Sequence, residues 1–416
     1  MSSPAYIVSG KRTPFVKTGG DFARQTPLSL SGRVMTAMFE DAIADLIVWG
    51  QVIPSVSYSN GAREAALDAG VPDAIPAYST QLACSTSMMG AIQAAGLLGK
   101  GGLERILVGG VEQMSRVPLA FTDDAAARLM GLAQSDPSAL PDALSKLSFS
   151  DVNLPTKGWA NRISGRTMGD HMEETAKKLS IDRAKQDQIA LASHQNAASA
   201  RATGFFDDLI IPVGEIHQDG LIRPDTSADK LAGLKPVFDP VNGSLTAGNS
   251  SPLTDGAAGV WIVSEEGLKQ FSGRPIAKLV DFELGAVNFI EHGMLMAPAY
   301  AIPRLLARHS LTYDDIDLYE IHEAFAAQVL ANIQVASDAV ARSAYSDVEA
   351  KLGEFPWDRL NPTGGSLALG HPFGATGARI LSQTVKQLAN MESGSRALIS
   401  VCADGGQGTV ALIESV

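Results

Sequence analysis

Cys84 and His371 stand where predicted helices begin, at positions suited to reactive side chains. Cys84 follows a strand-like run, residues 77–83, and precedes a helical run of small residues, 87–98. His371 follows a glycine-rich stretch and precedes a helical pattern that starts after Pro372. Backbone N–H groups and the helix dipole favour negative charge at a helix N-terminus. Both residues are therefore placed where an anionic intermediate could be stabilised.

Cys402 and His322 each come directly after a predicted strand. Cys402 follows the apolar run 397–401 and opens the sequence CADGGQG, and His322 follows the run 316–321. A thiol attacks as thiolate, and we expect a helix N-terminus with a neighbouring imidazole to lower the pKa of Cys84. A second thiol can exchange a proton with a leaving carbon, and glycine turns expose N–H groups to an oxyanion. This set predicts acyl transfer through a thioester.

A metal site is the alternative use of the same side chains, since two cysteines and two histidines form a common zinc ligand set. No pair among them has the short sequence spacing of structural zinc sites. We therefore expect no metal and no permanently bound cofactor.

The composition of the chain excludes several classes of protein. Its 416 residues suggest two or three domains, and 45% hydrophobic with 19% charged residues is typical of a core-rich globular protein. The net charge of −12 argues against a nucleic-acid partner. No apolar run is long enough for a membrane span, and the first residues resemble a strand rather than a secretory signal. With two unpaired cysteines, a cytoplasmic bacterial protein is expected, and a mitochondrial or other organellar location stays open.

The order of predicted elements favours an α/β fold. Strands and helices alternate up to residue 116 and again from 246, which predicts βαβ units and a mostly parallel sheet. Between them, 117–245 reads as an inserted, mainly helical region whose amphipathic stretches in 123–147 are expected to pack on the core, although a partner or membrane surface stays open. The individual elements are predicted as strands 4–10, 48–54, 77–83, 105–111, 276–283, 316–321, 397–401 and 409–413 and helices 28–47, 60–69, 87–98 and 323–335.

An internal repeat relates the two halves of the chain. Cys84 lies six residues before Gly90–Ala91, and His371 lies six residues before Gly377–Ala378. Each pair is followed by a helix, a strand and a glycine turn. The repeat predicts a duplicated fold in which Cys84 and His371 hold equivalent positions and face each other across a pseudo-two-fold axis.

The chain resembles the thiolase family over nearly its whole length. The segments that carry the resemblance are KRTPF (11–15), NGAREAAL (60–67), the Cys84 segment, GGVEQMS (109–115), TAGNSSPLTDGAA (246–258), HEAFAAQ (322–328), GGSLALGHPFGATGAR (364–379) and CADGGQG (402–408). His322, where biosynthetic thiolases have Asn, is similar to the thiolase (β) subunit of the fatty-acid trifunctional enzyme. MGDHMEE (168–174) and the long region 117–160 are similar to it too.

The resemblance implies a fold of two duplicated βαβαβαββ-type halves in five layers, α-β-α-β-α, with a helical loop domain. The N-terminal half would comprise 1–116, completed by 246–267. The loop domain, 117–245, would cover the coenzyme A (CoA) site, and 268–416 would form the C-terminal half.

The resemblance also implies a 3-ketoacyl-CoA thiolase that cleaves its substrate with CoA in fatty-acid β-oxidation. Cys84 would become acylated, His371 would take its proton, Cys402 would protonate the leaving carbanion, and His322 would act with His371 on the enolate oxygen. The backbone at Cys84, Asp404 and Gly405 would form an oxyanion hole. Residues implied to lie along CoA are Met168, Arg223, Phe238, Ala247, Gly248, Ser251, Leu253, Ala324 and Phe325.

Three positions depart from the family pattern, and two other functions stay open. Asp404 stands where many thiolases have Gly, Thr86 where Ser is usual, and Thr167 where biosynthetic members have His. One alternative is an acetoacetyl-CoA thiolase working in the condensing direction. The other is a non-catalytic CoA- or lipid-binding scaffold. The resemblance further implies a homodimer or tetramer, and it raises a hydratase/dehydrogenase partner subunit and a membrane association as open questions.

Overall fold

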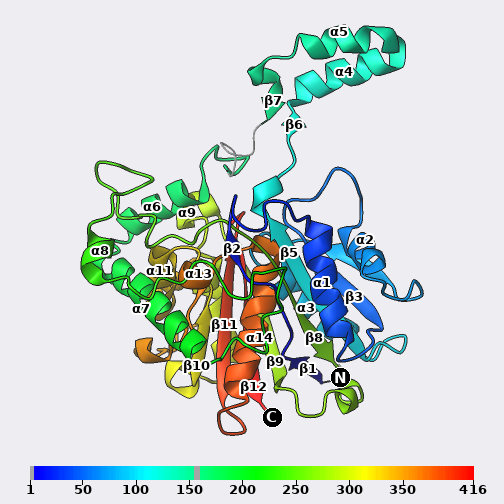
Figure 1. The fold of residues 1–416 in the computed structure, drawn as a ribbon. Coiled ribbons are helices and arrows are strands. Elements are labelled where there is room, and N and C mark those ends of the chain that lie inside the picture. Colours follow the sequence, from blue (N-terminus) through cyan, green and yellow to red (C-terminus); the bar gives the residue numbers. More distant parts are fainter. Residues whose placement is uncertain (1–3, 154–159) are drawn as a thin grey trace.

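The computed structural model describes residues 4–153 and 160–416. Its centre is a ten-stranded sheet in the order β10-β11-β12-β9-β1-β8-β5-β3-β4, with β2 beside β8 (Figure 1). The strands of this sheet are β1 (Ala5–Val8), β2 (Val16–Lys17), β3 (Leu46–Gly50), β4 (Ala77–Thr80), β5 (Arg105–Gln113), β8 (Thr254–Val263), β9 (Ile276–Ala286), β10 (Leu318–Ile321), β11 (Arg396–Ala403) and β12 (Gln407–Ser415).

Four strands of each half of the sheet follow one arrangement, as the internal repeat predicts, and the N-terminal half adds β4 at its edge. The N-terminal half pairs β4-β3-β5-β8-β1 and the C-terminal half pairs β10-β11-β12-β9, and the halves join through antiparallel pairing of β1 with β9. The helices of the two halves are α1 (Pro27–Phe39), α2 (Gly61–Asp68), α3 (Thr86–Leu97), α9 (Phe289–His292), α10 (Ala297–Arg308), α11 (Ala326–Ser337), α12 (Ala339–Arg342), α13 (Ser366–Leu369) and α14 (Thr376–Leu388).

Buried clusters show how the helices cover the sheet. Side chains of α3 and α14 share one core with inward residues of both halves, such as Val108 and Ile399. Residues of α1 and α2 pack on the other face of the N-terminal half, and residues of α10 and α11 on the other face of the C-terminal half. The expected five-layer arrangement is therefore present, with α3 and α14 in the middle layer.

The expectation of a mostly parallel sheet is wrong. Only the pairs β3–β4, β3–β5 and β10–β11 of this sheet are parallel. After β5 the chain leaves the sheet and returns at the same end as β8, where Gln113 lies opposite Asp255. Between β11 and β12 it turns back within Asp404–Gly406. A strand that re-enters at the end where its predecessor left must run antiparallel to it.

Several predicted boundaries also shift. The helix expected at 28–47 ends at Phe39, because residues 46–50 form strand β3. The strand expected at 77–83 ends at Thr80, and the helix expected at 323–335 begins at Ala326. The residues lost from these last two elements lie in the turns that carry Cys84 and His322.

The region between β5 and β8 is mainly helical, as expected. It contains α4 (Asp123–Ser135), α5 (Leu140–Ser145), α6 (Met168–Lys178), α7 (Arg183–Ala202), α8 (Ala228–Ala232) and the strand pair β6 (Ala120–Phe121) and β7 (Val152–Asn153). The 3-10 turns of the chain are η1 (Met114–Arg116), η2 (Pro137–Ala139), η3 (Phe149–Asp151), η5 (Gly267–Gln270), η6 (Tyr313–Asp315), η7 (Trp357–Arg359) and η8 (Phe373–Ala375).

The amphipathic stretches of 123–147 do not pack on the core, contrary to expectation. Helices α4 and α5 form a hairpin that projects from the body of the molecule beyond β6 and β7 (Figure 1). Ala125 and Leu129 are buried, whereas Met130 and Leu144 are 60% and 47% exposed. The buried apolar side chains of α4 thus pack within the projecting hairpin. Within the described residues, no helix combines the length and apolar character needed to cross a lipid bilayer.

The two middle helices approach closely where their N-termini meet. The Ala378 N–H donates to Ser87 Oγ at 2.9 Å, and a Cβ on Gly377 would lie 2.4 Å from the Met88 nitrogen. Glu112, buried at the end of β5, accepts hydrogen bonds from the backbone N–H groups of Val52, Ile53 and Gly374. It is therefore a structural carboxylate, and it anchors the turn before α14.

Replacing Gly377 by alanine should destabilise the fold, because the added methyl group meets backbone atoms that cannot move away. We expect a loss of about 1–3 kcal/mol in the free energy of unfolding. Gly96→Ala on the facing helix α3 is the matched control, since a Cβ there meets nothing within 4 Å. It should be neutral or stabilising by up to about 1 kcal/mol. Equal effects of the two substitutions in denaturant unfolding would contradict the close approach.

Candidate active site

Cys84 occupies a strained turn between β4 and α3. Ala83, which precedes it, has a φ of 43°, in the left-handed region that a residue with a Cβ seldom adopts. The turn is held by Thr86, whose Oγ1 accepts from the Leu82 N–H at 2.8 Å and donates to the Ala83 carbonyl at 2.7 Å. Threonine at position 86, a departure from the usual family residue, thus keeps the hydroxyl on which the turn depends.

His371 lies between α13 and the 3-10 turn η8 that leads into α14. Gly370 before it has a φ of 98°, and a Cβ there would lie 2.7 Å from the Thr254 side chain. The His371 Nδ1 atom is 2.7 Å from Thr376 Oγ1, and the Thr376 hydroxyl donates to the Pro372 carbonyl at 3.1 Å. Since this hydroxyl has one hydrogen, it accepts from Nδ1. We therefore assign His371 the Nδ1–H tautomer, with a free lone pair on Nε2.

His322 and Cys402 come from the parallel strands β10 and β11. The His322 N–H donates to the Ser400 carbonyl at 2.8 Å, which extends the pairing of the two strands into the site. His322 Nδ1 lies 2.9 Å from Ser366 Oγ. Cys402 is fully buried, two residues further along β11 than Ser400. Strand pairing therefore fixes both side chains.

The fold brings Cys84, His322 and His371 together. One ligand-type atom from each lies within 4.8 Å of the others, and the centroids of the two imidazole rings are 4.1 Å apart. Both Nε2 atoms are buried, and neither has a hydrogen-bond partner among the described residues. Since each Nδ1 is bound to a hydroxyl, the free Nε2 atoms are the groups available to the thiol and to a ligand.

The same three side chains could also ligate a metal ion. A thiolate and two imidazoles form one ligand set of zinc. Burial, however, lowers the pKa of both imidazoles, and the buried Arg379 guanidinium lowers it further. Low solvation and a neighbouring positive charge also disfavour a dication at this place. We therefore interpret the cluster as a site of proton transfer.

Burial controls the protonation of the site. Burial, followed by the Asp404 and Glu112 carboxylates, raises the pKa of Cys84 to about 12, and the backbone N–H groups of Cys84 and Asp404 oppose this rise. Burial and then Arg379 lower the pKa of His371 to about 3. Burial likewise raises the pKa of Cys402 well above its usual value. The expected lowering of the thiol pKa is therefore wrong, because desolvation outweighs the helix N-terminus. The resting pair is a neutral thiol beside a neutral imidazole.

The residues expected at the oxyanion hole divide into two groups. The backbone N–H groups of Cys84 and Asp404 both interact with the Cys84 sulfur. The N–H of Gly405, in contrast, donates to the Met294 sulfur at 3.2 Å. The N–H groups of Cys84 and Asp404 therefore act on the Cys84 thiol, whereas the N–H of Gly405 is bound to Met294.

The Asp404 carboxylate is held by the inserted region. Asn161 Nδ2 donates to Asp404 Oδ1 at 3.0 Å, while Asn161 Oδ1 accepts from the N–H of Ile163 in its own turn at 3.0 Å. This bond gives the carboxylate a hydrogen-bond partner from the inserted region. It also links the turn after Cys402 to the segment that covers it.

The residues expected along CoA lie on the loop 246–253 and the elements beside it. The Ser251 N–H donates to the Ala324 carbonyl at 2.9 Å, and Leu253 bridges to His371. The loop thus runs between the two histidine turns. Met168, Phe238, Ala324 and Phe325 join one apolar cluster with Cys402, Gly248 is buried against Leu231 and Leu234, and Arg223, Ala247 and Leu253 are exposed.

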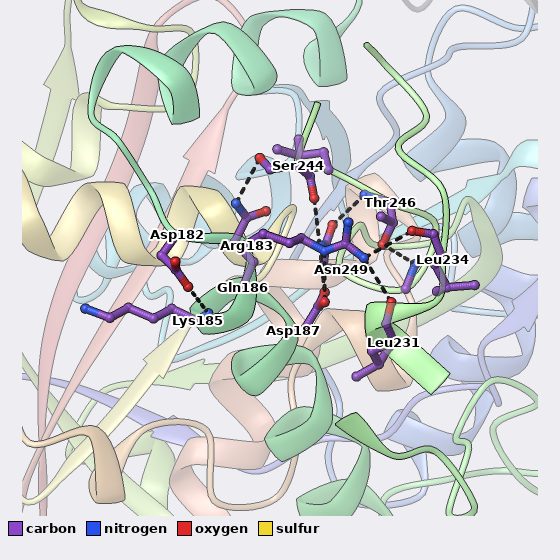
Figure 2. Close-up of polar contacts among 12 residues, drawn as sticks. Asp182, Arg183, Lys185, Gln186, Asp187, Leu231, Leu234, Ser244, Thr246 and Asn249 are labelled. Carbon is purple, nitrogen blue, oxygen red and sulfur yellow. Dashed lines mark hydrogen bonds and ion pairs between the residues drawn. The ribbon is translucent and has the colours of Figure 1, made fainter. Parts of the chain in front are cut away.

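Helix α7 fixes this loop through a polar network (Figure 2). Asn249 donates from Nδ2 to Asp187 Oδ1 at 3.0 Å and accepts from the Thr246 N–H at 2.7 Å. Asp187 in turn accepts from Arg183 Nε at 2.8 Å, and Arg183 Nη2 donates to the carbonyls of Leu231 and Leu234. The backbone around Ala247 and Gly248 is therefore set before any ligand binds.

Sequence reasoning missed the residues that support the reactive ones. Glu323, buried next to His322, accepts from Ser193 Oγ, Asn361 Nδ2 and the Leu367 N–H, and so holds the loop before α13. Its place beside His322 in the HEAF segment was the available signal. Ser366, Thr376 and Arg379 lie inside the glycine-rich segment itself, while Asn161 and Met294 carried no signal in the sequence.

The chain is similar to known proteins over nearly its whole length. The family model described as "Thiolase, N-terminal domain" matches residues 5–266, and "Thiolase, C-terminal domain" matches 273–415. The mitochondrial trifunctional enzyme subunit beta of Bos taurus is 36% identical, over 98% of this chain and 88% of its own length. A 3-ketoacyl-CoA thiolase of Vibrio cholerae is 35% identical, over 98% and 96%. The crystal structure of the Bacillus anthracis acetyl-CoA acetyltransferase superposes with a TM-score of 0.82 at 30% identity, covering 100% of this chain and 99% of that one.

Alkylation of Cys84 by iodoacetamide should accelerate with pH well beyond the usual thiol pKa of 9.0, because the folded pKa lies near 12. Thiolate is the reactive form, so its fraction keeps rising until the pH reaches the folded pKa. The rate constant is followed by mass spectrometry of the Cys84 peptide. A plateau below pH 9.0 would instead indicate a preformed thiolate–imidazolium pair.

Neutralising Asp404 should make Cys84 more reactive, because that carboxylate raises the thiol pKa. For Asp404→Asn we expect alkylation at pH 8 to be faster by roughly threefold, which corresponds to a pKa change of about half a unit. Asp73→Asn, at an exposed carboxylate, is the control and should leave the rate unchanged. A slower rate in Asp404→Asn would show that the carboxylate assists the thiol.

Proposed function

Because this chain belongs to the thiolase family, we propose that it is a 3-ketoacyl-CoA thiolase (acetyl-CoA acyltransferase) of fatty-acid β-oxidation. It would cleave 3-ketoacyl-CoA with CoA to acetyl-CoA and a shortened acyl-CoA. The observation that carries the proposal is the convergence of Cys84, His322 and His371 within 4.8 Å at the meeting helix N-termini. CoA is a substrate in this reaction, and the proposal requires no permanently bound cofactor.

The first half-reaction acylates Cys84. As its sulfur attacks the 3-keto carbon, the thiol proton passes to Nε2 of His371, whose lone pair is free in the assigned tautomer. The carbonyl oxygen becomes an oxyanion that the N–H groups of Cys84 and Asp404 stabilise. The bond between C2 and C3 then breaks, and the electron pair stays on the acetyl-CoA fragment as an enolate.

Protonation and acyl transfer complete the cycle. His371, now carrying the proton on Nε2, and His322 stabilise the enolate oxygen, and Cys402 protonates the carbanion to release acetyl-CoA. Incoming CoA loses its thiol proton to the Cys402 thiolate and attacks the acyl group on Cys84. The Cys84 sulfur leaves and recovers its proton from His371, so both cysteines return to the neutral form.

The CoA substrate would lie under the loop domain, 117–245, which is inserted within the N-terminal half (1–116, completed by 246–267) and precedes the C-terminal half, 268–416. The residues that support this placement are Met168, Phe238, Ala324 and Phe325, which line one apolar cluster with Cys402. Ala247, Gly248, Ser251 and Leu253 border it on a loop that α7 holds in place, and Arg223 provides an exposed positive charge for phosphate.

Assembly and location are proposed by analogy with the relatives. We propose a homodimer or tetramer. The likeness to a trifunctional enzyme subunit beta favours a partner subunit with hydratase and dehydrogenase activities. We propose a bacterial cytoplasmic location. The alternative is an organelle, because some relatives are mitochondrial.

The discriminating experiment compares two substrates. Purified protein is mixed with CoA and either a long-chain or a short-chain 3-ketoacyl-CoA, and the loss of the substrate enolate absorbance is followed. A preference for the long chain supports degradation, whereas activity confined to acetoacetyl-CoA supports the condensing alternative.

Replacing Cys84 by alanine should abolish cleavage, with a loss of at least about 10³-fold in kcat, since the acyl acceptor is gone. CoA binding should survive, because Cys84 is not among the residues along CoA. Binding is checked by calorimetry on the same preparations. CoA binding without cleavage in the unaltered protein would contradict the enzyme and favour the scaffold.

A further inference from the structure

A buried arginine lies behind the two catalytic histidines. Arg379, on α14, is 2% exposed, and its Nη2 donates to Ser366 Oγ at 2.8 Å. Its Nε and Nη1 atoms have no hydrogen-bond partner among the described residues. A buried cation without a direct ion pair is costly to a fold. Because Arg379 costs the fold stability, its presence here points to a role at the site.

Ser366 connects this arginine to His322. Its Oγ lies 2.9 Å from His322 Nδ1 and is fully buried. Guanidinium groups only donate, so Ser366 accepts from Arg379 and keeps its single hydrogen for another acceptor. His322 Nδ1 is the remaining partner. If Ser366 donates there, the His322 proton must reside on Nε2, the atom that faces the reacting groups.

The two histidines are therefore assigned opposite tautomers. Thr376 accepts from Nδ1 of His371 and leaves a lone pair on Nε2, whereas Ser366 donates to Nδ1 of His322 and leaves a hydrogen on Nε2. One imidazole can take a proton and the other can give a hydrogen bond. The tautomer of each ring is set by whether the hydroxyl at its Nδ1 accepts or donates a hydrogen bond.

The charge of Arg379 reinforces this arrangement. Burial lowers the pKa of Arg379 to about 10, with Glu320, Glu323 and Asp219 opposing the fall and Arg12 adding to it, so the group stays cationic at neutral pH. Burial, His371 and Arg379 together hold the pKa of His322 well below its usual value. A neutral imidazole, not an imidazolium, is thus presented to the enolate oxygen.

We propose that Arg379 and Ser366 are positioning residues that lock His322 as a neutral Nε2–H donor to the enolate oxygen of the substrate. The inference rests on the proposed thiolase reaction and deepens it. It explains how His322 can act on the enolate. If the ring were free to change tautomer, Nε2 would sometimes carry a lone pair instead of a hydrogen, and that lone pair would repel the enolate oxygen.

Ser366→Ala tests the hydrogen-bonded relay from Arg379 through Ser366 to His322 with a small change. Without the hydroxyl, His322 loses its donor, and we expect kcat for 3-ketoacyl-CoA cleavage to fall about 10- to 100-fold, since one oxyanion donor is worth about 10²–10³ in kcat. KM should change less than kcat. Alkylation of Cys84 by iodoacetamide should stay within about twofold, because it depends on His371 and not on the enolate. Ser366→Thr, which restores a hydroxyl, should recover part of kcat.

Thr376→Val is the matched variant on the other histidine. It removes the acceptor that fixes His371, so alkylation of Cys84 and cleavage should fall together. A fall of both rates in Ser366→Ala as well, or an unchanged kcat in that variant, would overturn the relay. Absence of cleavage in the unaltered protein would instead overturn the proposed function, so the two failures are distinguishable. Thermal unfolding of each variant checks that the fold is retained.

Arg379 is tested through the pH profile of kcat/KM. Arg379→Met removes the cation, so the pKa values of both imidazoles should rise and the acid limb should move to higher pH by about one unit. Arg379→Lys keeps the charge and should keep the limb near its original position. If the limb does not move in Arg379→Met while Ser366→Ala retains full kcat, Arg379 has only a structural role.

Discussion

The close meeting of two helix N-termini is the constraint on which the rest of the molecule depends. The Ala378 N–H reaches Ser87 across the junction, and Gly377 leaves no room for a side chain against Met88. The duplicated halves and the β1–β9 pairing bring α3 and α14 into one layer. Only at that separation can the turn before α3 present a thiol to the imidazole before α14. The chemistry therefore follows from a packing distance between the halves of the sheet.

Desolvation is the second determinant of the site. Burial drives Cys84, His322 and His371 toward their neutral forms, and Arg379 adds to this effect on the histidines. A neutral thiol is a weak nucleophile, so in the proposed reaction proton transfer to His371 accompanies the attack rather than precedes it. The cost of creating charge in such a site is met by fixed N–H groups that need no reorganisation. The same burial that slows the free thiol thus protects it until a substrate arrives.

Because motifs and repeats are local signals, the sequence predicted the duplicated fold and the grouping of Cys84, His322 and His371, and the family resemblance supplied the five layers. The roles of these residues stay a prediction. The sequence did not predict the antiparallel pairing of β5 with β8, since that depends on where a long insertion returns to the sheet. Nor did it predict that Asn161 would hold the Asp404 carboxylate, a contact between segments 243 residues apart. Ser366 and Arg379 were visible in a recognised segment, but their bonds to each other and to His322 depend on side-chain geometry. The projecting α4–α5 hairpin shows that an amphipathic pattern alone does not identify the surface it meets.

The most direct test of the account is to look for the covalent intermediate. The protein is incubated with a 3-ketoacyl-CoA in the absence of CoA, and the products are followed by intact-mass and peptide mass spectrometry. The account predicts a single burst of acetyl-CoA, with the shortened acyl group attached to Cys84 and none on Cys402. An acyl group on Cys402, or a burst without any acylated cysteine, would contradict the assignment of Cys84 as the nucleophile.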